Sequence, residues 1–350
     1  MLTRLWHDGL SPAMPAPMKR VALILFLFVL LMNGRHSGNQ PPATFDSLSV
    51  RARALSAAEV GDLASYGPLR LTGAWQLTGS HPAFGGFSSL VVSDDGALVA
   101  LNDTGELFGF RVSGERGQGF VKPLPRVGLE QGWPSWKWDS ESMQRDPVTG
   151  RSWVGFEFLQ RICRYAPDFK ALEGCVEPPA VRNWPLTGGM ESLVRFGDGR
   201  FMTISEMGTT KNGAHDVVLW RGDPVDPATP PPVHLGYRPP TGYRPTDALW
   251  LGGDKLLILN RRLTLADGFT ARLVLVTLPK LEAGAVFSGA IVATFAPPGL
   301  ADNFEALALS RVMGQPTLWV ASDDNHFFLQ RSLLLRFALP ADWVSDRPAP

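Results

Sequence analysis

The feature that most constrains the fold of this chain is a short unit that occurs five times along it. Each unit has an apolar strand, a turn rich in Gly and Asp, and a second apolar strand, with charged side chains beside the strand ends. The five units span residues 87–103, 139–157, 190–206, 246–261 and 302–324. Successive units start about 50 to 60 residues apart, which is near the period of the blades of a β-propeller.

The last unit is the clearest of the five. Its strands are expected at Phe304–Leu309 and Thr317–Ala321, and the turn between them carries Gly314 and Pro316. Because a propeller blade has four antiparallel strands, the recurring hairpin is expected to be the inner pair of each blade. The sequence therefore predicts a single all-β propeller.

The outer strands are less regular, and Arg161–Tyr165 and Val217–Trp220 are two candidates. Residues 69–80 and the last strand, Ser332–Leu339, are expected to close the ring by sharing a blade. Counting this shared blade beside the five hairpins, we expect six blades. A chain of 350 residues with 45% hydrophobic residues is long enough to bury a core of this size as one domain.

The N-terminal segment has an export pattern. Basic residues in Met18–Arg20 precede the twelve apolar residues Val21–Met32, which is typical of a signal sequence and short for a membrane span. No clean small-residue cleavage site follows, so an uncleaved membrane anchor remains an alternative. We assign residues 1–38 to this signal or anchor, 39–68 to a linker, 69–340 to the propeller and 341–350 to a C-terminal tail. The body is expected in the periplasm or anchored on the outer face of the inner membrane.

Several function classes find no support in the sequence. The formal net charge is zero and no patch rich in Lys and Arg occurs, so nothing favours binding of nucleic acid. The chain lacks the glycine-rich dinucleotide and phosphate loops, the HExxH zinc motif and the GxSxG nucleophile motif. The sequence gives no indication of the oligomeric state.

The only two cysteines, Cys163 and Cys175, flank a turn over residues 166–170. In an oxidising compartment they could form a disulfide across a hairpin. The alternative is a pair of buried thiols. No further Cys or His pair accompanies them, so a zinc site is not indicated.

Charged residues recur where the strands of each hairpin begin and end. A hairpin brings its two ends together, so these side chains should converge on one axial mouth of the propeller. The predicted metal ligands are Asp103, Glu141, Glu157, Glu191, Glu206, Asp302, Glu305, Asp323 and Asp324, with Asp139 and Asp247 beside them. Carboxylates crowded in this way repel each other unless a cation offsets them. Arg261 and Arg331 are the expected counter-charges, and oxygen ligands in this number suit Ca²⁺.

Each of these residues also has a purely structural interpretation. A single acid at a strand end often caps a turn or joins two blades through backbone N–H groups. His326 could be a proton carrier or a solvated loop residue. Trp133, Trp136 and Trp138 could line the mouth or pack between blades, and Lys137 and Lys211 could contact an anion or simply lie on the surface.

The repeat resembles the phytase-like domain family, also described as "esterase-like activity of phytase". The most distinctive match joins Asp302–Leu307 to Ser322–Asn325 and Gln330–Leu334, and weaker matches lie in the earlier units. The resemblance covers about residues 70–340. It implies an exported bacterial β-propeller with hydrolase activity on esters. The fourth unit departs from the family pattern: it ends Asn260–Arg262 where the family often shows Glu-Arg, which removes one carboxylate, while Arg261 matches the family arginine.

Three hypotheses follow. The first is a metal-assisted hydrolase of phosphate or carboxylic esters, in which Ca²⁺ is the expected cofactor and a small-molecule ester or phosphate is the ligand. Its catalytic candidates are Glu191, Glu206, Glu305, Asp323 and Arg261. The second is a non-catalytic propeller that binds a ligand or a partner in the cell envelope. The third is a purely structural propeller.

Overall fold

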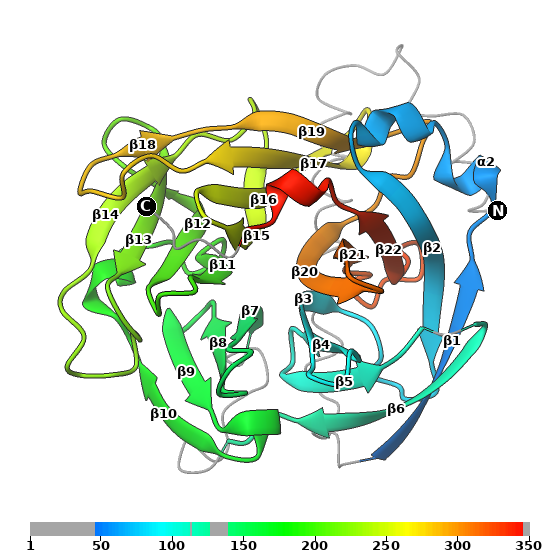
Figure 1. The fold of residues 1–350 in the computed structure, drawn as a ribbon, viewed down its shortest axis with the longest axis horizontal. Helices are drawn as coiled ribbons and strands as arrows, with labels where there is room; N and C mark the ends of the chain where they lie inside the picture. Colours follow the sequence, from blue (N-terminus) through cyan, green and yellow to red (C-terminus); the bar gives the residue numbers. More distant parts are fainter. Residues whose placement is uncertain (1–45, 113, 127–138, 346–350) are drawn as a thin grey trace, which may run out of the picture.

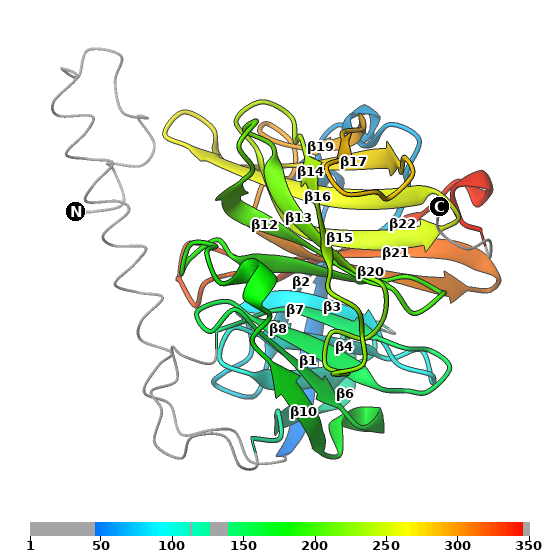
Figure 2. The ribbon, with the colours of Figure 1, turned by 90° about the vertical axis from the view of Figure 1, so that its left-hand side faces the viewer.

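The computed structural model describes residues 46–112, 114–126 and 139–345. Twenty of its strands form five antiparallel, four-stranded blades around a central axis (Figure 1). Figure 2 shows the ring turned by 90°, with β17 at the top and β10 at the bottom. The prediction of a single β-propeller is confirmed. The expected signal or anchor and Trp133, Trp136, Lys137 and Trp138 lie outside the described residues.

Each blade begins at the central axis and runs outward. The strands of blade 1 are β3 (Phe87–Val92), β4 (Leu98–Asn102), β5 (Glu106–Phe110) and β6 (Arg116–Pro123). Those of blade 2 are β7 (Ser140–Arg145), β8 (Ser152–Phe156), β9 (Arg161–Tyr165) and β10 (Leu172–Val176). Those of blade 3 are β11 (Met190–Arg195), β12 (Phe201–Thr209), β13 (His215–Trp220) and β14 (Val233–Tyr237), with the short β18 (Val286–Phe287) parallel to β14.

The last two blades complete the ring. The strands of blade 4 are β15 (Arg244–Gly252), β16 (Lys255–Thr264), β17 (Gly268–Thr277) and β19 (Ala290–Phe295). Those of blade 5 are β20 (Phe304–Val312), β21 (Gln315–Ser322), β22 (Leu333–Ala338) and β2 (Arg70–Gly79). The innermost strands contact each other in ring order, from β3 through β7, β11 and β15 to β20 and back to β3.

The expectation of six blades was wrong, because the described chain forms five. Strands β2 and β22 do pair, with Ala74 opposite Leu335, and so close the ring as expected. However, β22 also pairs with β21, so the shared blade is the blade of the fifth hairpin and not an additional one.

The ordered fold starts before the expected boundary at residue 69. Strand β1 (Asp46–Ala54) lies between β2 and β6 and thereby joins blade 5 to blade 1 in one nine-stranded sheet. Its buried residues Leu48, Val50 and Ala52 alternate with polar ones, and the polar residues gave the segment its linker-like composition. The short α2 (Ala57–Val60) and the 3₁₀ turn η2 (Leu63–Tyr66) follow.

The first residues of the expected C-terminal tail are also part of the fold. The 3₁₀ turn η6 (Ala341–Trp343) follows β22. Beyond it, the backbone N–H of Ser345 donates to Leu251 O at 2.9 Å. Gly252 makes this approach possible: its φ is +98°, and a Cβ there would lie 1.5 Å from Ser345 O. Among the described residues, no helix has the length and apolar character needed to cross a bilayer.

The hydrophobic core lies between the blades. Each pair of neighbouring blades encloses one cluster of buried side chains, for example Met143 and Val154 of blade 2 against Leu101 of blade 1. On the other face of the same blade, Trp153 packs against Phe201 of blade 3. Successive residues of a strand point to opposite faces, so strands buried on both sides read as apolar runs. This is why the inner hairpins were visible in the sequence.

Strands β9 and β10 place Cys163 directly opposite Cys175, and the two form a disulfide. The loop between them contains the 3₁₀ turn η4 (Pro167–Phe169), and η5 (Pro179–Val181) follows β10. The structure therefore has the disulfide and not the alternative pair of buried thiols. A disulfide of this kind is typical of proteins in oxidising compartments.

Candidate functional site: an acidic axial mouth

A β-bulge recurs at the same place in all five inner hairpins. In blade 3, for example, Met190 pairs with Ser205 and Ser192 with Ile204, so no residue of β12 lies opposite Glu191 in the strand register. A bulge turns the extra side chain out of the regular alternation. The residues at the five bulges are Ser88, Glu141, Glu191, Thr246 and Glu305.

In the second strand of each hairpin, the residue that follows the partner of the residue before the bulge lies at the same sheet edge. These five residues are Asp103, Glu157, Glu206, Arg261 and Asp323. The ten positions surround the ring axis at one end of the propeller, which we call the axial mouth. Seven of the ten are acidic and one is an arginine. The antiparallel register thus brings together the predicted acids of four blades, and blade 4 contributes the arginine.

Most of these acids are shielded from solvent. The buried ones, with exposed fractions between 5% and 8%, are Glu157, Glu191, Glu206, Glu305 and Asp323, and the neighbouring Asp302 is 7% exposed. Burial raises the pKa of Glu191 well above its ordinary value, and the nearby carboxylates of Glu141 and Glu206 raise it further. Burial is also the main cause that raises the pKa of Asp323 to about 7.

The remaining acids interact across the channel. Burial raises the pKa of Asp103 well above its ordinary range, and the charges of Asp323 from blade 5 and Glu141 from blade 2 add to the shift. Burial and the charge of Glu157 raise the pKa of Glu141 to about 7. Carboxylates of different blades are therefore close enough to oppose each other's ionisation.

Arg261 is the main counter-charge at the mouth. Its Nη1 donates to Glu305 and, at 2.7 Å, to Asn303 Oδ1, while its Nη2 lies 3.2 Å from Glu206 Oε1. Arg331 Nε lies 3.4 Å from Asp302 Oδ2 at the edge of the site. Both arginines thus form ion pairs with acids, but they leave the acids of blade 2 without an ion pair among the described residues.

Those acids of blade 2 form the arrangement best suited to a metal. Asp139, Glu141 and Glu157 each offer an oxygen, and these oxygens all lie within 4.8 Å of one another. Glu157 is held in place by the backbone N–H groups of Gly188 and Gly189, the latter at 3.1 Å from Oε1. Oxygens at such separations can surround Ca²⁺, whose bonds to oxygen are about 2.3–2.6 Å long. The donor set therefore fits a hard divalent cation.

Two of the predicted acids have structural contacts instead. Asp247 accepts the backbone N–H groups of Ala248 and Leu307, both at 2.7 Å, and so ties blade 4 to blade 5. Asp324 Oδ1 accepts from Gly86 N at 2.9 Å and His326 N at 3.0 Å, and its Oδ2 accepts from Ser332 Oγ at 2.6 Å. Asp324 thus orders the loop after β21 against the loop before β3.

Asp103 Oδ1 and His326 Nε2 are among the buried polar atoms that have no hydrogen-bond partner within the described residues. Both face Gly86, since a Cβ built on that glycine would lie 3.3 Å from Asp103 Oδ1 and 2.9 Å from His326 Nε2. The proximity of these two side chains to Gly86 was not predicted, because nothing in the sequence relates residue 103 to residue 326.

Asn303 lies in the segment that carries the family resemblance, but no role at the site was predicted for it. Its Oδ1 accepts from Arg261, and its Nδ2 donates to Asp323 Oδ2 at 3.2 Å. It therefore links the counter-charge of the mouth to one of the acids with a raised pKa.

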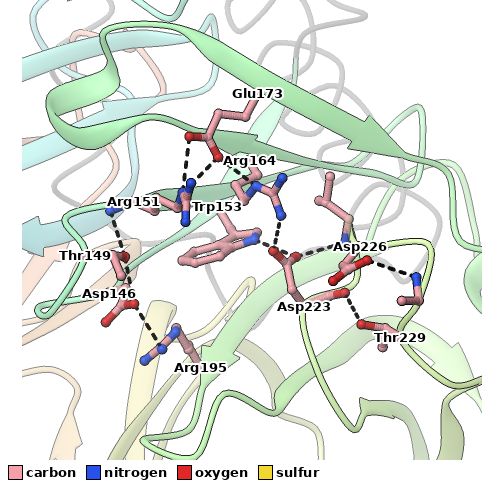
Figure 3. Close-up of polar contacts among 12 residues, drawn as sticks. Asp146, Thr149, Arg151, Trp153, Arg164, Glu173, Arg195, Asp223, Asp226 and Thr229 are labelled. Carbon is pink, nitrogen blue, oxygen red and sulfur yellow. Dashed lines mark hydrogen bonds and ion pairs between the residues drawn. The ribbon is translucent and has the colours of Figure 1, made fainter.

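The opposite edge of the blades has a different charge pattern (Figure 3). There the acids are paired with arginines: Arg195 Nη2 lies 3.1 Å from Asp146 Oδ2, and Arg164 Nη1 lies 2.5 Å from Asp223 Oδ2. Trp153 Nε1 also donates to Asp223 Oδ1 at 2.8 Å. At this edge each of these acids has an arginine as its counter-charge, whereas the mouth has more acids than arginines.

Comparison with known families assigns this chain to one of them. The model of the phytase-like family, described as "Esterase-like activity of phytase", matches residues 82–326. The chain belongs to the phytase-like family. The match contains the inner hairpins of all five blades and every acid of the mouth. No curated protein matches the chain.

Several solved structures resemble this phytase-like chain at a low level. The allergen Mala s 1 of Malassezia sympodialis is 11% identical, covers 82% of this chain and 95% of its own, and has a TM-score of 0.42. The WD40 propeller domain of Doa1 is 10% identical, with 79% and 99% covered and a TM-score of 0.39. The PQQ-bound aldose sugar dehydrogenase of Streptomyces coelicolor is 11% identical, with 85% and 100% covered and a TM-score of 0.36. The assignment of the fold rests on the strand pairing described above.

The raised pKa values predict how stability depends on pH. Glu141 and Asp323 have a pKa of about 7 in the folded protein, above the ordinary values of 4.5 and 3.8. A group whose pKa is raised by folding stabilises the fold below its unfolded pKa, and that stability is lost as the pH rises through the folded value. The metal-free protein should therefore unfold at a temperature lower by about 5 °C or more at pH 8 than at pH 5.

Calorimetry in the presence of EDTA measures this difference. The double variant Glu141→Gln with Asp323→Asn should show a much smaller change between the two pH values. Equal unfolding temperatures of the wild-type protein at pH 5 and pH 8 would mean that these acids are neutralised by groups other than protons.

Proposed function

We propose that this phytase-like propeller is an exported hydrolase of phosphate or carboxylic esters that acts at the axial mouth with the help of Ca²⁺. The observation that carries the proposal is the excess of buried acids at the mouth, where a single arginine from blade 4 faces seven carboxylates. Family membership and the oxygen-only donor set of blade 2 support it.

The residues divide into two groups by their position. Asp139, Glu141 and Glu157 would hold the cation. A bound Ca²⁺ would polarise the phosphoryl or carbonyl oxygen of the ester and favour ionisation of a bound water. Glu157 is already oriented for this task by the backbone of the next blade.

The second group would handle protons and the charge of the substrate. Glu191 and Asp323 have raised pKa values, so either can hold a proton near neutral pH and pass it to a leaving group. Glu206 and Glu305 fix the guanidinium of Arg261 at the mouth, where its N–H groups can donate hydrogen bonds to the negatively charged oxygens of a substrate.

Export is part of the proposal. The signal pattern before residue 38 and the disulfide between Cys163 and Cys175 both fit an oxidising compartment such as the periplasm. Whether the N-terminal segment is cleaved or retained as an anchor is open to a direct test by mass spectrometry of the protein recovered from the cell envelope.

The proposal is tested by assaying the full chain with aryl phosphates and aryl carboxylic esters, first in EDTA and then with added Ca²⁺. We expect Ca²⁺-dependent hydrolysis that is lost in the double variant Glu191→Gln with Glu305→Gln, while the circular dichroism of the fold is unchanged. The double variant Asp94→Asn with Asp198→Asn removes two acids outside the mouth and should retain the activity.

The second candidate function is a non-catalytic binding propeller. It is favoured by the absence, among the described residues, of a serine or cysteine nucleophile paired with a base at the mouth. Binding of Ca²⁺ and of a phosphate ester without turnover, across the whole set of substrates, would favour this function over hydrolysis.

A further inference from the structure

A second polar site lies away from the mouth, on the outer surface where β1 joins blade 5 to blade 1. Strands β2, β1 and β6 run side by side there (Figure 1). A shallow open groove of about 330 Å³ follows the exposed face of these strands. Its polar lining residues are Ser49, Arg51, Thr78, Ser80, Arg116 and Gln118.

The strand register sets two rows of side chains across this groove. Arg51 of β1 lies directly opposite Arg116 of β6 on one side and Thr78 of β2 on the other. In the neighbouring row, Ser49 lies opposite Gln118 of β6 and its backbone N–H donates to Ser80 Oγ at 3.0 Å. Because opposite residues of antiparallel strands point to the same face, both rows project into the groove.

The two arginines form an unfavourable pair. Like charges directly opposite each other on neighbouring strands destabilise a sheet, because their side chains start only about 5 Å apart. Within the described part of the chain, neither Arg51 nor Arg116 has a carboxylate within ion-pair distance. The next arginine of β1 is different: Arg53 Nη2 lies 2.8 Å from Glu59 Oε1. The fold thus neutralises the charge of Arg53, whereas Arg51 and Arg116 could be neutralised by an anion that binds between them.

The groove also offers neutral hydrogen-bond donors around the two guanidinium groups. Ser49 Oγ donates to Gln118 Oε1 at 3.3 Å, which leaves the amide N–H groups of Gln118 free to donate outward. The hydroxyl groups of Thr78 and Ser80 stand in the same two rows. Guanidinium groups with nearby hydroxyl and amide donors match the oxygens of phosphate, which accept several hydrogen bonds at once.

We propose that the groove between β2, β1 and β6 binds a phosphate group, either as a free phosphate compound or as the headgroup of an anionic phospholipid. This site is independent of the acidic mouth and of the hydrolase activity proposed there. An oxyanion between Arg51 and Arg116 would convert their repulsion into two attractive contacts and fasten β1 to the sheet at the point where the described chain begins.

Calorimetric titration of the full chain with inorganic phosphate, in EDTA to keep Ca²⁺ from the mouth, tests the site. We expect saturable binding that weakens at least tenfold in the double variant Arg51→Gln with Arg116→Gln. Arg70→Gln, which removes another exposed arginine from β2 outside the groove, should bind as the wild type does. Equal weakening by Arg70→Gln, or unchanged binding in the double variant, would overturn the proposal.

Thermal unfolding supplies a second readout that a purely structural role would not give. Without phosphate, Arg116→Gln should raise the unfolding temperature because it removes the like-charge pair. With phosphate, the wild-type temperature should rise and the variant's should not. A fall in the variant's unfolding temperature in phosphate-free buffer would overturn the proposal, because the facing arginines would then be stabilising by themselves.

Vesicle flotation separates the two sources of the phosphate group. The full chain is compared on vesicles of phosphatidylcholine alone and of phosphatidylcholine with phosphatidylglycerol, so that any contribution of the N-terminal segment is common to both. An increase on the anionic vesicles that disappears in the double variant identifies a lipid headgroup. Phosphate titration without such an increase identifies a soluble phosphate compound.

Discussion

Replacing Arg261 with Gln is expected to lower the free energy of unfolding by about 3–5 kcal/mol at neutral pH, because it removes one partner of a buried ion-pair network. The guanidinium contacts Glu305, Glu206 and Asn303, and both acids are at least 92% shielded from solvent. Without it, the two carboxylates remain buried beside the other acids of the mouth. Urea unfolding of the metal-free protein at pH 7.5 measures the change.

The exposed pair of Arg111 and Asp95 provides the control. Their side chains are 49% and 67% exposed, so Arg111→Gln should change the free energy of unfolding by at most about 1 kcal/mol. Lowering the pH to 5 should recover much of the stability of the Arg261 variant, since protonation then neutralises the acids. If the Arg261 variant unfolds at the wild-type urea concentration at pH 7.5, the mouth is not held together by this arginine.

The inner hairpins could be predicted from the sequence because their strands are buried on both faces. The hairpin of β20 and β21, for example, is apolar in nearly every central position, from Phe304 to Leu309 and from Leu318 to Ala321. The closing strand β2 and the disulfide partners were likewise visible as local patterns. The number of blades was not, because it depends on which hairpin β22 joins, and strand order is set by contacts far apart in the chain.

Strand β1 was missed for a related reason. Only one of its faces is buried, and the arginines and serines on the other face give it the composition of a linker. Its position between β2 and β6 depends on closure of the ring, and ring closure cannot be predicted from a local sequence pattern.

The sequence predicted that acids gather at one end of the propeller, but it did not predict which strand positions face the mouth. Acids were expected at both ends of each hairpin; the sheet edges of blades 1, 2, 3 and 5 bring acids together, and blade 4 contributes Arg261. However, a shift of one residue turns a strand side chain to the other face. In blade 4 the bulge falls on Thr246, so Asp247 points to the backbone of blade 5 and not to the mouth. Asp324, one residue beyond Asp323 in the loop after β21, accepts hydrogen bonds from Gly86, His326 and Ser332.

Replacing Glu141 with Gln should reduce Ca²⁺-dependent ester hydrolysis by at least about a hundredfold and abolish the rise in unfolding temperature caused by Ca²⁺. Glu141 belongs to the oxygen set formed with Asp139 and Glu157. Gln keeps the shape of the side chain and removes its charge. In EDTA at pH 8 the same variant should unfold at a higher temperature than the wild type, because its neighbours Glu157 and Asp323 then face one charge fewer.

Asp247→Asn is the matched control for this variant. Asp247 is also a buried acid in an inner strand, but both of its oxygens accept backbone N–H groups. Its replacement should lower stability by about 1–3 kcal/mol through a buried hydrogen bond that is no longer made, and should leave the response to Ca²⁺ intact. If Ca²⁺ raised the unfolding temperature of the Glu141 variant as much as that of the wild type, the cation would bind away from blade 2. The orphaned oxygen of Asp103 would then be the next ligand to replace, since it is the acid at the mouth whose buried oxygen lacks a partner among the described residues.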